Sequence, residues 1–144
     1  MPRLFPAILY ALVLLASACH KNPTDQPEPA GSLEGTWRVG LTDPVEYDAQ
    51  NNVLATYQPQ ANIMDYTQLK FTGTHLEQYH EQANISSLTP YVRMGDQLTC
   101  PAPAGSYTIR KLTTRHLDLY YKGDYQQTGS RSFRTDFTIH LERQ

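Results

Sequence analysis

A period-two alternation of apolar and polar residues is the feature that most constrains how this chain can fold. In the clearest run, SFRTDFTIHLER, four apolar side chains share one face of an extended strand: Phe133, Phe137, Ile139 and Leu141. Successive side chains of a β-strand point to opposite sides, so this run predicts a strand with one face in a core. Helical periodicity hardly appears, and the sequence therefore predicts an all-β fold.

Four further runs alternate in the same way and are bounded by turn residues, as in KFTGTH, AGSY and YKGDY. Their expected core residues are Trp37, Val39 and Leu41 in GTWRVGLT, Leu69 and Phe71 in QLKFTG, Tyr107 and Ile109 in GSYTIRKL, and Leu117, Leu119 and Tyr121 in RHLDLYYKG. No spacing typical of a βαβ unit appears, so the strands should be antiparallel and joined locally.

The segments between these runs are less regular. PVEYDAQNNVLATYQP predicts a hairpin that turns at residues 50–52, and HLEQYHEQ predicts a strand. ANISSLTPYVRMGD is compatible with a short helical turn, which Pro90 would interrupt. YYKGDYQQTGSR reads as a long polar connection between the last two strands, and it carries Tyr120, Tyr121 and Tyr125.

Together these segments give about eight strands in one domain. An antiparallel up-and-down meander of that size removes its edges by closing into a small barrel, for which eight strands is a natural number. A β-sandwich is the alternative, and we favour the barrel.

The first residues have the layout of a secretory signal. Arg3 precedes an uncharged, mainly apolar run, Leu4 to Leu15, and the small residues Ala16-Ser17-Ala18 follow. The run has about 12 residues, whereas a helix that spans the bilayer needs about 20, which disfavours a permanent transmembrane helix. The chain is therefore expected to be exported.

Cys19 comes directly after these small residues, and LASAC resembles the lipobox of bacterial lipoproteins. The resemblance implies a signal peptide over residues 1–18 and lipid attachment to Cys19; an ordinary signal-peptidase site before an incidental cysteine is the alternative. Residues 19–32 are rich in proline and lack large apolar side chains, which predicts an extended tether. The folded domain is then expected over residues 33–144.

A second resemblance lies at the two ends of this domain. SLEGTWRVG, with Gly35 and Trp37, resembles the glycine-any-tryptophan motif that opens lipocalins, and GSYTIRKLTTRHLDLYY is similar to the penultimate hairpin of small bacterial lipocalin-like lipoproteins. In lipocalins an arginine near the end packs across that tryptophan and closes the barrel bottom, and here Arg143 has the matching position. The resemblance implies a lipocalin-like barrel without the helix that follows the last strand of classical lipocalins.

The resemblance also implies a cup that binds a small apolar or amphipathic molecule. Its candidate lining residues, which alternation places inward, are Phe71, Tyr107, Ile109, Leu119, Tyr121, Phe137 and Ile139. An eight-stranded barrel is barely wider than its own side chains, so a solid-core barrel that serves as an envelope protein-interaction module is the rival hypothesis. The tyrosines near residues 120–125 fit either a mouth that grips a ligand or ordinary cross-strand packing.

No pattern in the chain indicates an enzyme, a cofactor or a metal. His75 and His80 have opposite strand parity, and no phosphate loop, serine elbow or Cys-x-x-Cys motif occurs. The formal net charge of −2 disfavours a nucleic-acid partner. With Cys19 lipidated, Cys100 would have no partner within the chain and is expected to be a small, semi-buried side chain.

The expected location is thus the bacterial cell envelope. Lipidated Cys19 would hold the protein to a membrane, with the outer membrane favoured over the inner, and the domain would lie in the periplasm or at the cell surface. The protein partner, if the barrel has one, is not indicated by any motif.

Overall fold

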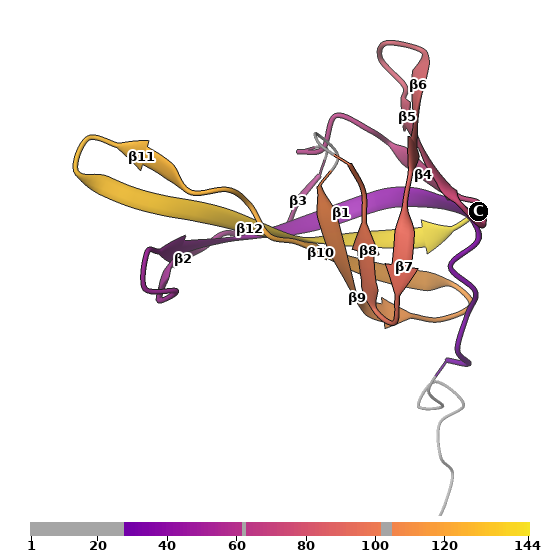
Figure 1. Ribbon diagram of the computed structural model, residues 1–144, viewed down its shortest axis with the longest axis horizontal. Helices are drawn as coiled ribbons and strands as arrows, with labels where there is room; N and C mark the ends of the chain where they lie inside the picture. The colour runs from indigo at the N-terminus through magenta and orange to yellow at the C-terminus, as the bar shows by residue number, and fades with distance from the viewer. Residues whose placement is uncertain (1–27, 62, 102–104) are drawn as a thin grey trace, which may run out of the picture.

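The computed structural model describes residues 28–61, 63–101 and 105–144, and within these ranges every regular element is a β-strand (Figure 1). The strands are β1 Gly35–Asp48, β2 Val53–Thr56, β3 Gln60–Ala61, β4 Gln68–Phe71, β5 His75–His80, β6 Ile85–Pro90, β7 Val92–Met94, β8 Gln97–Thr99, β9 Ser106–Leu112, β10 His116–Tyr121, β11 Gln126–Thr128 and β12 Arg131–Arg143. All paired strands are antiparallel, which confirms the predicted fold class.

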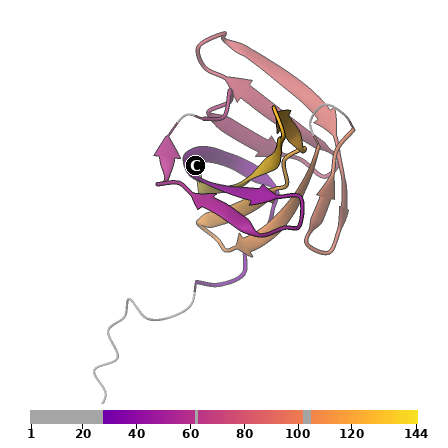
Figure 2. The same cartoon turned by 90° about the vertical axis from the view of Figure 1, so that its left-hand side faces the viewer.

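The sheet curls until its two edges meet, as the end-on view in Figure 2 shows. The order around it is β6-β5-β4-β1-β12-β10-β9-β8-β7. The first and last strands of this order, β6 and β7, are consecutive in the chain and are separated by Tyr91 alone. One chain segment therefore pairs with β5 through its first half and with β8 through its second half, and the meander is nearly closed into a barrel.

The sheet has twelve strands, more than the eight or so expected. Three of them, β2, β3 and β11, pair outside the main path, and β6 and β7 occupy one position that is interrupted at Tyr91. The extra strands are thus short strands that pair with β1 or β12, together with the interruption at Tyr91. The barrel wall without them has fewer strands than the whole sheet.

A β-bulge in β1 changes which residues face the core. The register shifts between Val39 and Thr42, so that Thr42 is 1% exposed whereas Leu41 is 49% exposed. An extra residue in one strand reverses its alternation beyond that point. The expectation that Leu41 faces inward with Trp37 is wrong for this reason.

The barrel interior is filled by large apolar side chains. Those with almost no exposed surface are Trp37, Leu69, Phe71, Leu76, Leu98, Leu117, Leu119, Ile139 and Leu141. They come from six strands of the wall. All of them except Leu76 and Leu98 lie in the alternating runs of the sequence, and those runs predicted that each would point inward.

Two other expectations are confirmed and two are wrong. Residues 50–52 turn between β1 and β2, with Asn51 at a positive φ of 65°, and HLEQYHEQ contains β5. The segment that was compatible with a helical turn forms β6 and β7 instead, because its backbone pairs with β5 and β8 on either side of Tyr91. The polar connection after β10 is not free of structure, since it contains β11, which pairs with the start of β12.

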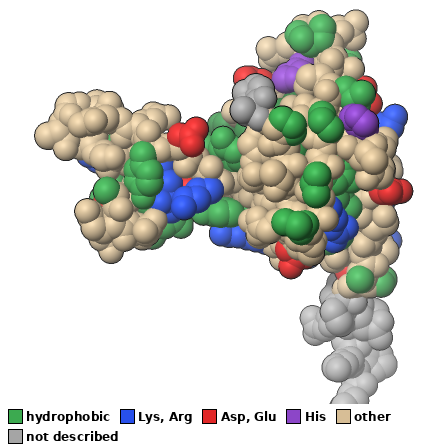
Figure 3. Space-filling view, in the orientation of Figure 1, with side chains coloured by type: hydrophobic (Ala, Val, Ile, Leu, Met, Phe, Trp, Pro, Cys, Tyr) green, Lys and Arg blue, Asp and Glu red, His purple; other side chains and the backbone are tan. Residues whose placement is uncertain are grey.

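β1 and β12 are much longer than the other strands, and they continue past the barrel as an arm (Figure 1). β2 pairs with the C-terminal part of β1, and β11 pairs with the N-terminal part of β12. The arm therefore consists of two hairpins side by side. The space-filling view shows Lys and Arg side chains gathered between these hairpins (Figure 3).

Residues 28–31, which the composition assigned to the tether, contact the barrel. Ala30 forms a bridge to Thr113, and a Glu28 carboxylate oxygen lies 2.8 Å from Nδ1 of His116. A Cβ on Gly31 would lie 1.9 Å from the backbone oxygen of Thr113, so only glycine fits this close approach. The contacts of the domain therefore begin several residues before Leu33.

Candidate functional site

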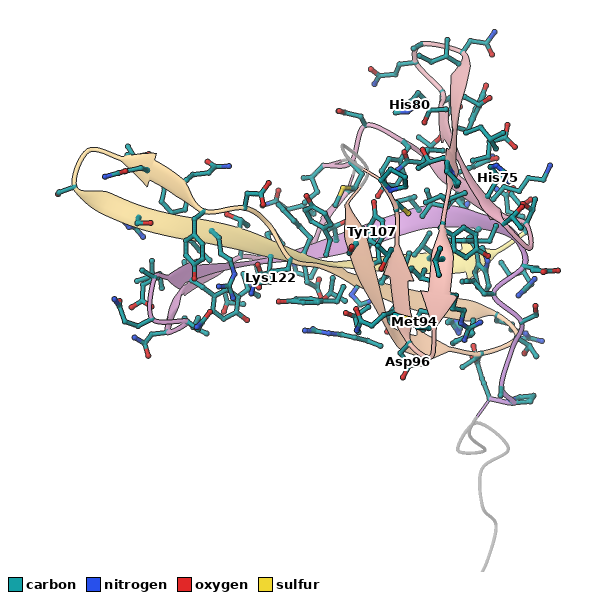
Figure 4. All side chains as sticks on the ribbon, in the orientation of Figure 1. His75, His80, Met94, Asp96, Tyr107 and Lys122 are labelled. Carbon is teal, nitrogen blue, oxygen red and sulfur yellow. The ribbon has the colours of Figure 1, made fainter. Side chains whose placement is uncertain are left out.

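The clearest concavity lies at the mouth of the barrel, at the end where the arm leaves it. It has a volume of about 560 Å³, within the range of small-molecule sites, about 300–1,000 Å³. Its lining comes from the segment before β4 and from β5, β6, β9, β10 and β12, through Ile63, Met64, Asp65, Tyr66, Gln78, His80, Ser87, Thr89, Tyr107, Tyr121 and Phe137. Figure 4 labels two of these residues, His80 on β5 and Tyr107 on β9.

Three aromatic rings from adjacent strands form one wall of the pocket. The rings of Tyr107 and Tyr121 have their centroids 5.6 Å apart, and those of Tyr121 and Phe137 are 6.4 Å apart. The strand register explains this row, because Tyr121 lies opposite Tyr107 on one side and opposite Phe137 on the other. Cross-strand neighbours on one face approach closely enough for such rings to pack.

Gly105 lies against the Tyr121 ring of this wall. Its φ is +74°, and a Cβ at this position would lie 2.8 Å from a ring carbon of Tyr121. Both the backbone conformation and the space therefore require glycine. Gly105, directly before β9, thus lets the Tyr121 ring lie against the backbone.

The opposite wall is more polar. Nδ1 of His80 lies 2.7 Å from the backbone oxygen of Asp65, which links β5 to the segment before β4. A carbonyl oxygen only accepts hydrogen bonds, so Nδ1 carries a proton and Nε2 of the neutral ring is left as an acceptor. The Tyr66 ring packs edge-on against His80, with centroids 6.3 Å apart.

The buried tyrosines of the mouth stay protonated. Burial raises the pKa of Tyr66 well above its ordinary value, and the neighbouring Tyr107 and Tyr121 raise it further. Burial also raises the pKa of Tyr107. These groups therefore offer neutral rings and hydroxyls to a molecule at the mouth, not phenolates.

The structure divides the seven candidate lining residues into two groups. Tyr107, Tyr121 and Phe137 line the mouth pocket. The other four, Phe71, Ile109, Leu119 and Ile139, are buried in the core below it. All seven point inward, but the large side chains in the lower half leave the hollow only near the mouth.

The alternation did not single out the polar half of this pocket. Met64, Asp65 and Tyr66 lie in a segment without period-two alternation, and strand parity alone gives His80 no partner. The one available signal was the apolar-acidic-aromatic triplet Met64-Asp65-Tyr66 directly before a strand.

At the opposite end of the barrel, Arg143 lies over Trp37. Cζ of Arg143 is 4.2 Å from the ring centroid, and the two residues are paired across β1 and β12. The guanidinium also donates hydrogen bonds to the backbone oxygens of Ser32, Glu34 and Thr114. It therefore ties the start of the domain to the last strand and to the β9–β10 turn.

Two further clusters of polar side chains lie outside the barrel core. In the arm, Arg134 and Asp136 form a buried ion pair, 2.9 Å from Nε to Oδ1, and the Tyr120 hydroxyl donates to the same carboxylate. On the barrel wall, both ring nitrogens of His140 lie 2.9 Å from a carboxylate oxygen, one of Asp43 and one of Asp118.

No group of three or more His, Cys, Asp or Glu side chains in the described ranges is arranged to hold a metal ion. Cys100 is buried, and burial raises the pKa of its thiol, as in a packed side chain and not a reactive one. Cys19 lies outside the described residues. Among residues 28–144, as far as the structure describes them, no helix is long and apolar enough to span a bilayer.

Comparisons of the chain with protein-family models, with curated proteins and with solved structures gave no match. The sequence patterns and the geometry of the mouth are therefore the observations that bear on function.

Proposed function

We propose that this protein is an exported lipoprotein, lipocalin-like in its barrel, that binds a small amphipathic molecule at the barrel mouth. Cys19 would carry the lipid anchor, and the domain would stand on the periplasmic or outer side of a bacterial envelope membrane. No catalytic step is part of this proposal.

The mouth pocket is the observation that carries the binding function. One wall is aromatic, through Tyr107, Tyr121 and Phe137, and the other offers polar groups from Asp65 and His80. Small-molecule sites combine an apolar lining with a few polar groups that fix orientation, and this pocket has both. The ligand would bury its apolar part against the rings and keep its polar part toward Asp65 and His80.

The filled core limits the size of that ligand. Leu119 and Ile139 have no exposed surface below the aromatic wall, so a long chain has no path toward Trp37. The proposed site is therefore a shallow cup at one end, unlike the deep cavity that a large lipid requires.

The anchor is supported by the sequence alone. The apolar run before Ala16-Ser17-Ala18 and the cysteine that follows fit a lipoprotein signal. Acyl chains contribute about 0.8 kcal/mol for each buried CH₂ group, so two or more give stable attachment to a membrane.

The second candidate function is a protein-interaction module, and the arm is the observation that favours it. Its hairpins expose Val53, Leu54, Tyr57 and Tyr125, each more than 40% exposed. A partner that binds there would leave the mouth pocket free, so binding at the arm and binding at the mouth are separable by mutation.

Native mass spectrometry of the full chain, purified gently from the cells that make it, tests the proposal. We expect a reproducible adduct of small mass that is released on denaturation and is lost when Tyr121 is replaced by Ala. The matched control is Tyr57→Ala in the arm, which should keep the adduct. A bare protein mass, unchanged when mixed amphiphiles are added, would overturn ligand binding and favour the interaction module.

A further inference from the structure

The Asp, Glu, Lys and Arg side chains that line the mouth are all acidic. Among its eleven lining residues there is one carboxylate, that of Asp65, and no Lys or Arg. An adjoining hollow of about 410 Å³ shares Met64, Asp65 and His80 with the pocket, and it adds the carboxylate of Glu81 and again no Lys or Arg. Within the described lining, the mouth therefore carries negative charge without a compensating Lys or Arg.

The cationic side chains are held elsewhere. Arg131 and Arg134 are paired with Glu46 and Asp136 in the arm, and Arg110 lies over the Tyr120 ring on the outer wall. Lys122, which follows Tyr121 in the chain, is exposed and does not line the pocket or the adjoining hollow; Figure 4 labels it.

The uncharged groups at the mouth also suit a positive charge. The faces of aromatic rings carry negative electrostatic potential, and Tyr107, Tyr121, Phe137 and Tyr66 all border the pocket. When the His80 ring is uncharged, its Nε2 is an acceptor, because Nδ1 donates to the backbone oxygen of Asp65. The hydroxyl groups of Ser87 and Thr89 can also accept hydrogen bonds.

We infer that the mouth pocket selects small organic cations, an ammonium group attached to a short apolar chain, over anionic or neutral amphiphiles. The ammonium group would lie between the aromatic wall and Asp65, with the apolar chain packed along Met64 and Phe137. This inference rests on the proposed function and narrows the class of its ligand. An anionic ligand such as a fatty acid would instead meet the carboxylates of Asp65 and Glu81.

The test is a calorimetric titration of the mature chain, residues 19–144, carrying Cys19→Ala, which should be soluble without its signal peptide and its lipid anchor. Three probes with the same alkyl chain are compared: hexyltrimethylammonium, hexanol and hexanoate. Contacts between cations and aromatic rings contribute about 0.5–2 kcal/mol, and about 1.4 kcal/mol corresponds to tenfold in affinity. We therefore expect the ammonium probe to bind about tenfold more tightly than hexanol, and hexanoate to bind weakest.

Two substitutions locate the effect. Tyr121→Leu keeps apolar bulk but removes one ring, and Asp65→Asn removes the charge at an exposed position where folding should tolerate it. Each should weaken ammonium binding about five- to tenfold and leave hexanol binding within about twofold. Asp96→Asn is the control, since this exposed carboxylate lies at the far end of the barrel from His80 (Figure 4) and should change nothing.

The possible failures are distinguishable. If hexanol binds as tightly as the ammonium probe, or hexanoate binds more tightly, selection for cations is overturned while binding of an amphiphile stands. If Asp65→Asn leaves the ammonium affinity unchanged, the assigned position of the charge is wrong. If no probe binds, both the inference and the proposed function are overturned.

Discussion

His140 shows how a single side chain joins three strands of the barrel wall. Its ring on β12 lies between Asp43 on β1 and Asp118 on β10, with 2.9 Å to each carboxylate. Burial would lower the pKa of His140, but the hydrogen bonds to both carboxylates outweigh it and raise the pKa above 6.5. Lys111 lies opposite Asp118 on β9, and His116 and Glu142 border the same stretch of wall.

This arrangement predicts how stability depends on pH. Because the folded state raises the pKa, the charged ring stabilises the fold fully below pH 6.5, and this contribution is lost as the pH rises through the folded pKa. Urea unfolding at pH 6 and at pH 8.5 should show a larger free energy of unfolding at pH 6. In His140→Gln the difference should shrink, whereas His75→Gln, whose ring contacts the Thr74 hydroxyl, should keep it. An equal pH dependence in all three proteins would contradict this role.

Trp37 and Leu41 test the β-bulge in β1. Trp37 has no exposed surface, whereas Leu41 is 49% exposed because the register shifts before Thr42. Trp37→Ala should lower the free energy of unfolding by about 3–5 kcal/mol, and Leu41→Ala by no more than about 0.5 kcal/mol. Equal losses would mean that β1 keeps its alternation without a bulge, and a loss below about 1 kcal/mol at Trp37 would remove it from the core.

At the scale of elements, the arm depends on charged and aromatic side chains in place of an apolar core. Arg134 is bonded to Asp136, to the Asn51 side chain and to the Tyr125 hydroxyl, and it therefore joins the β1–β2 hairpin to β12. Glu46 accepts from the Tyr57 hydroxyl and from Arg131. Such networks hold two hairpins in one arrangement as long as each buried group has a partner.

Removing one member of the buried pair should therefore destabilise the protein more than removing both. Asp136→Asn leaves the Arg134 guanidinium without its counter-ion, which should lower the free energy of unfolding by about 3–5 kcal/mol. The double substitution Arg134→Met with Asp136→Asn should recover part of this loss in chemical unfolding. A double variant less stable than Asp136→Asn alone would show that the two side chains do not act as a pair.

The strands show which parts of the fold and of the mouth could be predicted from the sequence. Alternation identified β9, β10 and β12 and the inward positions Tyr107, Tyr121 and Phe137, because each strand has one face in a core. It missed the reversal at Leu41, since a bulge of one residue leaves no separate pattern in the sequence. It also missed Asp65 and His80, whose contact joins the segment before β4 to the end of β5 through a backbone oxygen and a ring nitrogen. Burial of Arg134 and Asp136 was equally invisible, because alternation assigns charged residues to the solvent face.

At the scale of the whole molecule, the two ends of the barrel differ in character. One end is closed by Arg143 over Trp37 and is contacted by residues 28–31, which lead back toward the proposed anchor. The other end holds the mouth pocket and the arm. A lipid at Cys19 would therefore tether the protein by its closed end and leave the mouth accessible.

The anchor itself has a direct test. Cys19→Ala should move the protein from the membrane fraction to the soluble fraction after cell lysis and a wash at high pH, because no acyl chain can then be attached. Cys100→Ala is the matched control and should leave the protein with membranes. Complete retention of Cys19→Ala in the membrane fraction would contradict anchoring through this residue.

An NMR titration of the isotope-labelled chain carrying Cys19→Ala, with hexanol and with hexyltrimethylammonium, tests directly whether a ligand binds at the barrel mouth. We expect saturable shift changes in the backbone amides of His80, Tyr107, Tyr121 and Phe137, with Asp96 and the arm unaffected. Changes confined to the arm, or no saturable change with either probe, would contradict a ligand site at the barrel mouth.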